Sequence, residues 1–283
     1  MRITIFGATG LLGRALMREA REDEVTGLGS GDGDIRNQKQ VLELVQRSQP
    51  DWIVLAAAYT DVDGCETNRD LAFEVNCHGA LNVARAAKQH GCRLLFLSTD
   101  YVFDGAKSTP YATGDPRAPR SVYGQSKCEA EVQLSQILPE CCIVRTSWLF
   151  GNGGKCFPDT ILKLAASRPQ VEVVCDQRGS PTYSVDLARA ILQLCRNGAS
   201  GIVHATNQGE CSWYEFAKEI ISMAGLDTVV RETTSDRFVR PAERPKYSVL
   251  SLESLQKYGI SMPDWRDALR RYLAERESEV EHP

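Results

Sequence analysis

The chain of 283 residues is long enough to bury a full hydrophobic core, either as one large domain or as two modest ones. Its composition of 42% apolar and 25% charged residues excludes a disordered or fibrous protein. A net charge of −4 argues against a nucleic-acid partner, and the longest apolar run, 52–59, is too short to cross a membrane.

Apolar residues alternate between strand-like and helix-like spacing through the first half of the chain. Strands are predicted over 2–6, 25–28, 52–55, 93–97 and 141–145. Helices are predicted between them, over 11–21, 41–45, 71–90 and 123–137. This alternation is typical of βαβ units on a parallel sheet.

The second half has a looser pattern. Helices are predicted over 161–166, 185–195, 213–224 and 265–279, and short strands over 171–175 and 201–205. The stretch 233–245 is polar and rich in arginine. We therefore predict an α/β fold: a Rossmann-type, doubly wound parallel sheet over residues 1–150 and a smaller C-terminal substrate-binding lobe over most of 151–283. Part of 180–207 is expected to return to the sheet.

Ten cysteines are present, but none are spaced as CxxC and only Cys141 and Cys142 are close together. The four histidines form no zinc-like cluster with them. We therefore expect free thiols in a reducing cytoplasm. The N-terminus has no signal-peptide pattern, which agrees with a cytoplasmic protein.

A glycine turn, GATGLLG, joins the first predicted strand to the first helix. Gly7 allows a sharp turn off the strand, Gly10 allows the backbone to approach a pyrophosphate, and Gly13 allows close packing of helix on strand. Free amides at the helix start would face the phosphates. The turn therefore predicts dinucleotide binding.

The second predicted strand runs into Gly29 and Ser30, where a dinucleotide fold usually places an acid on the adenosine ribose. Asp32 and Asp34 come slightly late, and no arginine stands at the strand tip. Without the acid, the main repulsion against a 2′-phosphate is missing. We expect NADPH and keep NADH as the alternative.

Tyr123 and Lys127 open a predicted helix and share one of its faces. An ammonium beside a phenol favours the phenolate and brings its pKa toward neutrality. Thr99 follows the fourth predicted strand and can donate a hydrogen bond to a substrate carbonyl. We predict that these three residues form a catalytic group.

Several segments carry a more specific resemblance: AAYTDVD at 57–63, STDYVF at 98–103, RTSW at 145–148, GSPT at 179–182 and RPKYS at 244–248. Together with the glycine turn and the Tyr/Lys pair, they resemble the dTDP-4-dehydrorhamnose reductase family of the extended short-chain dehydrogenase/reductase superfamily. The resemblance spans nearly the whole chain.

The resemblance implies an oxidoreductase that reduces the C4 ketone of dTDP-4-dehydro-6-deoxy-L-mannose to dTDP-L-rhamnose. Thr99 would polarise the ketone, Tyr123 would donate the proton and Lys127 would tune Tyr123. These three would also contact the cofactor, and the implied further cofactor contacts are Gly10, Leu11, Leu12, Asp34, Ile35, Ala58, Tyr59 and Thr60. The implied substrate contacts are Tyr101, Val102 and Trp148.

Other properties stay open from sequence alone. The resemblance allows a monomer or a homodimer, and it allows Mg²⁺, for which no ligand can be placed. One alternative function is another sugar-nucleotide enzyme, an epimerase or a dehydratase, although Tyr101 stands where the resembling dehydratases carry a glutamate. A second is a non-catalytic, nucleotide-binding regulatory subunit.

Overall fold

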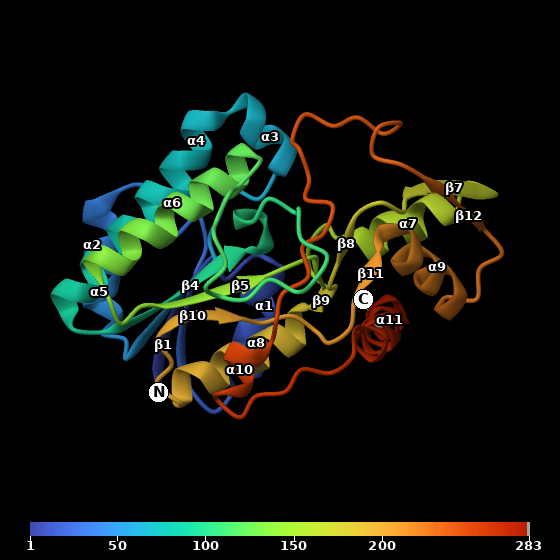
Figure 1. Ribbon diagram of the computed structural model, residues 1–283. Coiled ribbons are helices and arrows are strands. Elements are labelled where there is room, and N and C mark those ends of the chain that lie inside the picture. Colours follow the sequence, from blue (N-terminus) through green and yellow to red (C-terminus); the bar gives the residue numbers. More distant parts are fainter. Residues whose placement is uncertain (282–283) are drawn as a thin grey trace.

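The computed structural model describes residues 1–281, and its centre is a parallel sheet of six strands in the order β10-β5-β4-β3-β1-β2 (Figure 1). The chain passes from β1 to β2 on one side and then returns to place β3 on the other side of β1. This reversal creates a crevice at the carboxyl ends of β1 and β3, where such sheets bind ligands. The six strands are β1 (Arg2–Phe6), β2 (Glu24–Leu28), β3 (Trp52–Leu55), β4 (Arg93–Thr99), β5 (Cys142–Thr146) and β10 (Gly201–His204).

Helices cover both faces of the sheet (Figure 1). On one face α1 (Leu11–Glu19) packs beside α8 (Ser184–Arg196). On the other face α5 (Ala80–His90) packs between α2 (Gln38–Ser48) and α6 (Val122–Ile137). Strand β3 is buried along its whole length, as expected for a strand covered from both sides. The predicted doubly wound α/β fold is therefore confirmed.

Residues 71–90 are helical throughout, as predicted, but they do not form one regular α-helix. The structure divides 62–90 into α3 (Val62–Thr67), α4 (Arg69–Phe73), a π-helical segment η1 (Glu74–Gly79) and α5. The wider turn of the π-helix contains Asn76, which is buried and makes three side-chain hydrogen bonds. Apolar spacing alone does not distinguish a π-helical turn from an α-helical one.

A second group of elements lies beyond the carboxyl ends of the sheet (Figure 1). Its parallel pair β7 (Gln170–Val174) and β12 (Val229–Thr233) contacts α9 (Trp213–Met223), which also packs on α7 (Phe157–Ala165). The sequence analysis missed β12 because four of its five residues are exposed or only partly buried. Shorter elements complete the fold: η2 (Asp100–Val102), β6 (Leu149–Phe150), β8 (Arg178–Gly179), β9 (Thr182–Tyr183), β11 (Cys211–Ser212) and α10 (Glu253–Gln256).

The chain returns to the central sheet after β9. Helix α8 packs beside α1, and β10 pairs with β5 from Gly201 opposite Cys142 to His204 opposite Arg145. The division of the chain into two domains near residue 150 stays a prediction. No helix in residues 1–281 is long and apolar enough to span a membrane.

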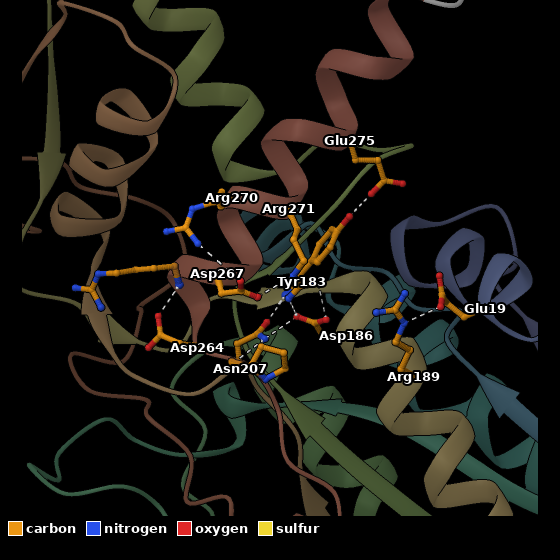
Figure 2. A network of polar contacts seen from close by, with 12 residues as sticks. Glu19, Tyr183, Asp186, Arg189, Asn207, Asp264, Asp267, Arg270, Arg271 and Glu275 are labelled. Atoms are coloured by element: carbon orange, nitrogen blue, oxygen red, sulfur yellow. Dashed lines mark hydrogen bonds and ion pairs between the residues drawn. The ribbon is translucent and has the colours of Figure 1, made fainter.

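A polar network fastens the last helix, α11 (Trp265–Glu281), to α8 and to the end of β9 (Figure 2). Arg271 forms two hydrogen bonds of 2.9 and 2.7 Å with the buried carboxylate of Asp186. Asn207 donates to the same carboxylate at 2.8 Å and accepts from the backbone N–H of Tyr183 at 2.7 Å. Because β9 pairs with β6, which directly follows Trp148, this network also anchors the segment that carries Trp148.

Candidate active site

The glycine turn lies at the reversal point between β1 and β3. Gly7 has φ +90°, and a Cβ there would lie 2.5 Å from the backbone nitrogen of Ala57. A Cβ on Gly13 would lie 2.1 Å from the carbonyl oxygen of Gly7. Gly10 is different, because a Cβ on it would meet only the Gly7 oxygen, at 3.5 Å. Gly7 and Gly13 are therefore required by packing, whereas Gly10, the N-cap of α1, borders open space suited to a phosphate.

The predicted cofactor contacts that follow the glycine turn and β2 differ in burial and in their partners. Leu12 is buried in the core, whereas Leu11 lies against the backbone position of Gly154. The Ile35 side chain is buried near Gly79, and its backbone carbonyl accepts a hydrogen bond from Asn82 Nδ2 at 3.0 Å. The Asp34 carboxylate accepts two hydrogen bonds from Nε of Arg36, at 2.8 and 3.0 Å.

The sequence analysis missed Arg36, because it looked for an arginine only at the tip of β2. Its guanidinium also lies 3.5 Å from Glu74, and it lines a shallow pocket with Asn37 and His78. A cationic side chain therefore stands beside Asp34, where the resemblance expects the adenine end of the cofactor.

The segment after β3, predicted to cover the cofactor, is held by Asn76. The backbone N–H of Tyr59 donates to Asn76 Oδ1 at 2.7 Å, and Asn76 Nδ2 donates to the Tyr59 carbonyl at 3.0 Å. The same Nδ2 lies 3.0 Å from Ser126 Oγ on α6. Ala58, Tyr59 and Thr60 are thus tied to the helix that carries Tyr123. An asparagine within an apolar helical pattern was the available signal for this role.

Thr99 ends β4, and Tyr123 lies in the first turn of α6. The N-terminus of α6 is capped by Ser121, whose Oγ accepts from the Gly124 N–H at 3.2 Å. Gly124 permits close approach, since a Cβ there would lie 2.3 Å from the Tyr101 carbonyl oxygen. The Tyr101 and Tyr123 rings meet edge to face with centroids 5.9 Å apart. The structure therefore brings β4, η2 and the start of α6 together at one edge of the sheet.

Burial controls the protonation of this group. It raises the pKa of Tyr123, and the hydroxyl of Thr99 acts in the opposite direction. The neighbouring Asp100 also raises the pKa of Tyr123, and burial raises the pKa of Asp100 itself to about 6. Asp100 Oδ1 accepts from Thr99 Oγ1 at 3.0 Å, whereas its buried Oδ2 has no partner among the described residues. Tyr123 is therefore a protonated phenol at neutral pH.

Lys127 is buried, with 2% of its surface exposed, and Nζ lies 4.0 Å from the centroid of the Phe96 ring. Burial lowers the pKa of Lys127 to about 7, and the negative charge of Glu131 partly opposes that shift. Burial is the largest cause of the pKa shift of both Tyr123 and Lys127. The lowering of the Tyr123 pKa by Lys127 stays a prediction.

A cavity of about 840 Å³ opens between the sheet edge and the second group of elements. Tyr101 lines it from η2, and Phe157 and Trp213 line it from α7 and α9. Arg240 and Arg244 line it from the polar stretch after β12. The cavity joins apolar rings to cationic groups, which suits a ligand with a base or sugar ring and an anionic group.

The other two predicted substrate contacts have different positions. Trp148 has φ +47° and stacks on Trp213, with centroids 3.5 Å apart and planes at 7°. It thus supports a ring that lines the cavity. Val102 is fully buried in a separate cluster with Phe103, so its side chain does not face the cavity. The sequence analysis missed Trp213. Nothing in the local sequence shows that Trp213 stacks on Trp148 and lines the cavity.

The described residues contain no group of three or more His, Cys, Asp or Glu side chains arranged to hold a metal ion. All ten cysteines lie within the described range and are free.

Comparisons with known proteins place the chain in a family. Residues 1–278 match the family model described as the RmlD substrate binding domain. A probable dTDP-4,6-dihydroxy-2-methyloxan-3-one 4-ketoreductase from Streptomyces antibioticus is 41% identical, over 95% of this chain and 94% of that protein. A dTDP-4-dehydrorhamnose reductase from Mycobacterium tuberculosis is 39% identical, over 96% of this chain and 92% of that protein.

A solved structure agrees with these relatives. The dTDP-4-dehydrorhamnose reductase from Bacillus anthracis, in complex with NADP, superposes with a TM-score of 0.94 and is 40% identical. The match covers 97% of this chain and 99% of the other. The whole chain therefore belongs to the RmlD family, the family of the dTDP-4-dehydrorhamnose reductases.

Proposed function

We propose that the protein reduces the C4 ketone of dTDP-4-dehydro-6-deoxy-L-mannose to dTDP-L-rhamnose. The observation that carries the proposal is the placement of two hydroxyl groups next to the cavity: the Thr99 hydroxyl hydrogen-bonds to Tyr123, and the Tyr123 ring meets that of Tyr101, which lines the 840 Å³ cavity. Membership of the RmlD family and the names of its members support the substrate. The relative from Streptomyces antibioticus, a probable ketoreductase of another dTDP-linked compound, supports the same reaction on a different ring.

In this mechanism Thr99 and Tyr123 handle the substrate oxygen. A bound nicotinamide cofactor supplies the hydride that reduces C4. Negative charge then develops on the former ketone oxygen, and the Thr99 hydroxyl donates a hydrogen bond to it. Tyr123 transfers its proton to the same oxygen, which completes the alcohol. The raised pKa of Tyr123 supports this direction, because the phenol holds the proton that the reduction consumes.

Lys127 has a second role in the proposal. Its Nζ lies over the Phe96 ring, and no described side chain hydrogen-bonds it, so its donors are available to a cofactor ribose. Ribose hydroxyls near Nζ would favour the ammonium over the neutral amine. The charged form of the lysine would then predominate when a cofactor is present, and that charge would assist proton release from Tyr123.

We infer that NADPH is the preferred cofactor. Arg36 stands beside Asp34 and can turn toward a 2′-phosphate, since its side chain is 44% exposed. The complex of the Bacillus anthracis relative with NADP supports this choice. NADH remains the alternative, because the Asp34 carboxylate can also accept from ribose hydroxyls.

The test is a cofactor-oxidation assay. The purified protein is mixed with enzymatically generated dTDP-4-dehydro-6-deoxy-L-mannose and with NADPH or NADH in parallel, and Tyr123→Phe serves as the control. Loss of reduced-nicotinamide absorbance that the control abolishes is the expected result. Interconversion of a dTDP-sugar without net cofactor oxidation would instead indicate an epimerase. Binding of NADPH without turnover of any dTDP-linked ketone would indicate a regulatory protein.

A further inference from the structure

A long segment between β12 and α10 crosses from the second group of elements to α3 (Figure 1). We call residues 235–246 of this segment the strap. Its attachment point is Asp63 in the first turn of α3. The Asp63 carboxylate accepts hydrogen bonds from Arg244 at 2.9 and 3.0 Å, from Arg240 at 3.1 Å and from the backbone N–H of Ala242 at 3.2 Å.

This attachment is more than an exposed ion pair. The Arg244 side chain is only 17% exposed, and its Nη1 also donates to the Ala242 carbonyl at 2.9 Å. Ala242 itself is buried. When a guanidinium pairs with a carboxylate through two hydrogen bonds, the orientation of the guanidinium is fixed as well as its position. The arginine contacts hold the pKa of Asp63 down, at about 2, so the attachment persists at any physiological pH.

The strap forms one wall of the cavity. Phe238, Arg240 and Arg244 all line it, and Arg240 lies 5.1 Å from the centroid of the Phe238 ring. Phe238 is 53% exposed, so an apolar ring and two guanidinium groups stand at the cavity opening. No strand or helix forms within the strap, so individual contacts hold it, and these also include Ser235 to Asp176 and Glu243 to Arg120. The pairing at Asp63 is the one that positions Arg240 and Arg244.

Helix α3 connects this wall to the proposed cofactor and proton-transfer groups. It begins directly after the segment Ala58–Thr60, and a Cβ on its Gly64 would lie 2.6 Å from the Tyr59 hydroxyl. Glu66, one turn further on, accepts from the backbone N–H of Val122 at 2.8 Å, next to Tyr123. One short helix thus contacts the cofactor segment, the start of α6 and the strap.

We propose that Asp63 is a positioning residue that couples the two ligand sites, so that a bound nicotinamide cofactor strengthens the binding of a nucleoside diphosphate. This inference rests on the proposed function, which places the cofactor against Ala58–Thr60. A cofactor packed against this segment adds contacts to the chain that leads into α3 and so restrains the helix further. Asp63 on that helix holds Arg240 and Arg244, which line the cavity where a diphosphate would bind. Binding of the diphosphate must strengthen cofactor binding by the same factor.

The test measures the coupling by calorimetry on the full chain. The dissociation constant of dTDP is determined alone and in the presence of saturating NADP⁺. The wild type is expected to bind dTDP about five-fold or more tightly with NADP⁺ present, a typical coupling. Asp63→Asn keeps the size of the side chain but weakens the arginine pairing. It should bring the ratio close to one while the affinity for NADP⁺ alone stays within about two-fold.

Asp236→Asn is the matched control, because it removes the same charge from the exposed part of the strap and should keep the wild-type ratio. Amide hydrogen exchange provides a second measurement: residues 235–246 should exchange faster in Asp63→Asn, with the central sheet unchanged. A wild-type ratio of one, or an Asp63→Asn variant that keeps the wild-type ratio, would overturn the coupling. A wild type that shows the coupling but oxidises no NADPH would contradict the proposed function alone.

Discussion

Tyr123 and Lys127 lie one helical turn apart, and burial affects their charges in the same sense. The pKa of the phenol is raised and that of the ammonium is lowered to about 7, so both groups favour their neutral forms. Thr99 is the group that partly opposes the shift of Tyr123. At the scale of single residues, this site favours a proton donor and leaves the lysine charge dependent on what binds nearby.

Replacing Tyr123 by phenylalanine removes the only proton that the mechanism uses while leaving the ring in place. We expect the turnover number to fall by about 10²–10⁴-fold, the usual contribution of acid–base catalysis. The dissociation constant for NADPH, measured by fluorescence titration, should barely change. Turnover within about ten-fold of the wild type would remove Tyr123 from the mechanism.

Replacing Lys127 by methionine should abolish turnover and yet stabilise the fold. The pKa of this group is lower in the folded protein, about 7, than its ordinary value of 10.5, so the unfolded chain binds more protons between these values. The wild-type free energy of unfolding should therefore rise with pH from about 7 toward 10.5. For Lys127→Met, denaturant unfolding at pH 7 and pH 9 should show a smaller increase in the free energy of unfolding with pH than for the wild type.

The exposed Lys39 provides the comparison for that experiment, since Lys39→Met should leave the pH dependence of unfolding unchanged. A Lys127→Met variant that is less stable than the wild type at pH 7 would contradict this expectation. It would show that favourable contacts of the Lys127 amine outweigh the cost of burying it.

At the scale of elements, α6 is held by a buried ion pair. Glu131 and Arg145 are both fully buried, and their closest contact joins Oε2 to Nη2 at 2.6 Å. Ser98 donates to the same carboxylate at 2.6 Å, and Arg145 also lies 3.3 Å from Nε2 of His204. The pair therefore connects α6 to β4, β5 and β10, one helical turn beyond Lys127.

Glu131→Gln should destabilise the protein by about 3–5 kcal/mol, because it leaves the Arg145 charge buried without a counter-ion. Glu129→Gln, on the exposed side of the same helix, should change the free energy of unfolding by less than about 0.5 kcal/mol. Both are measured by denaturant unfolding. Equal effects of the two substitutions would contradict the role of the buried pair.

Sequence patterns located most elements correctly but not their internal geometry. Strands β1 and β3 have the predicted bounds, because the large apolar side chains of each end where glycine or alanine follows. The π-helical turn around Asn76 could not be predicted. The three hydrogen bonds of the Asn76 side chain go to Tyr59, in the loop after β3, and to Ser126 on α6. The contact between Trp213 and Trp148 could not be predicted either, because the two residues are far apart in sequence and meet only in the folded structure.

At the scale of the whole molecule, α11 closes the structure by binding α8 and the end of β9 (Figure 2). Arg271 supplies the central contact, and its pKa is raised by the buried Asp186. The neighbouring Arg270 is 68% exposed and lies 3.8 Å from Asp267. The two arginines are neighbours on one helix, but only Arg271 is paired with the buried Asp186, so Arg270 serves as the exposed comparison.

Arg271→Leu should lower the free energy of unfolding by about 2 kcal/mol, less than a fully buried pair because the Arg271 side chain is 34% exposed. Arg270→Leu should stay within about 0.5 kcal/mol of the wild type. Thermal unfolding followed by circular dichroism checks both. Equal midpoints for the two variants would mean that α11 is held by its apolar face alone.

The sequence by itself determined the features that depend on near neighbours along the chain. The glycine spacing specifies a tight turn between a strand and a helix, and the spacing of Tyr123 and Lys127 places them on one helical face. The quoted motifs were sufficient to indicate the RmlD family, which the comparisons confirm.

Only the tertiary structure decided the properties that depend on distant residues. Asp63 and Arg244 meet across 181 positions of sequence, and Asn76 reaches Ser126 across 50. The protonation of Tyr123 and Lys127 depends on how completely other elements bury them. Local patterns contain no information on these distances or on that burial, because both arise only when the sheet edge, α3 and the strap are packed together.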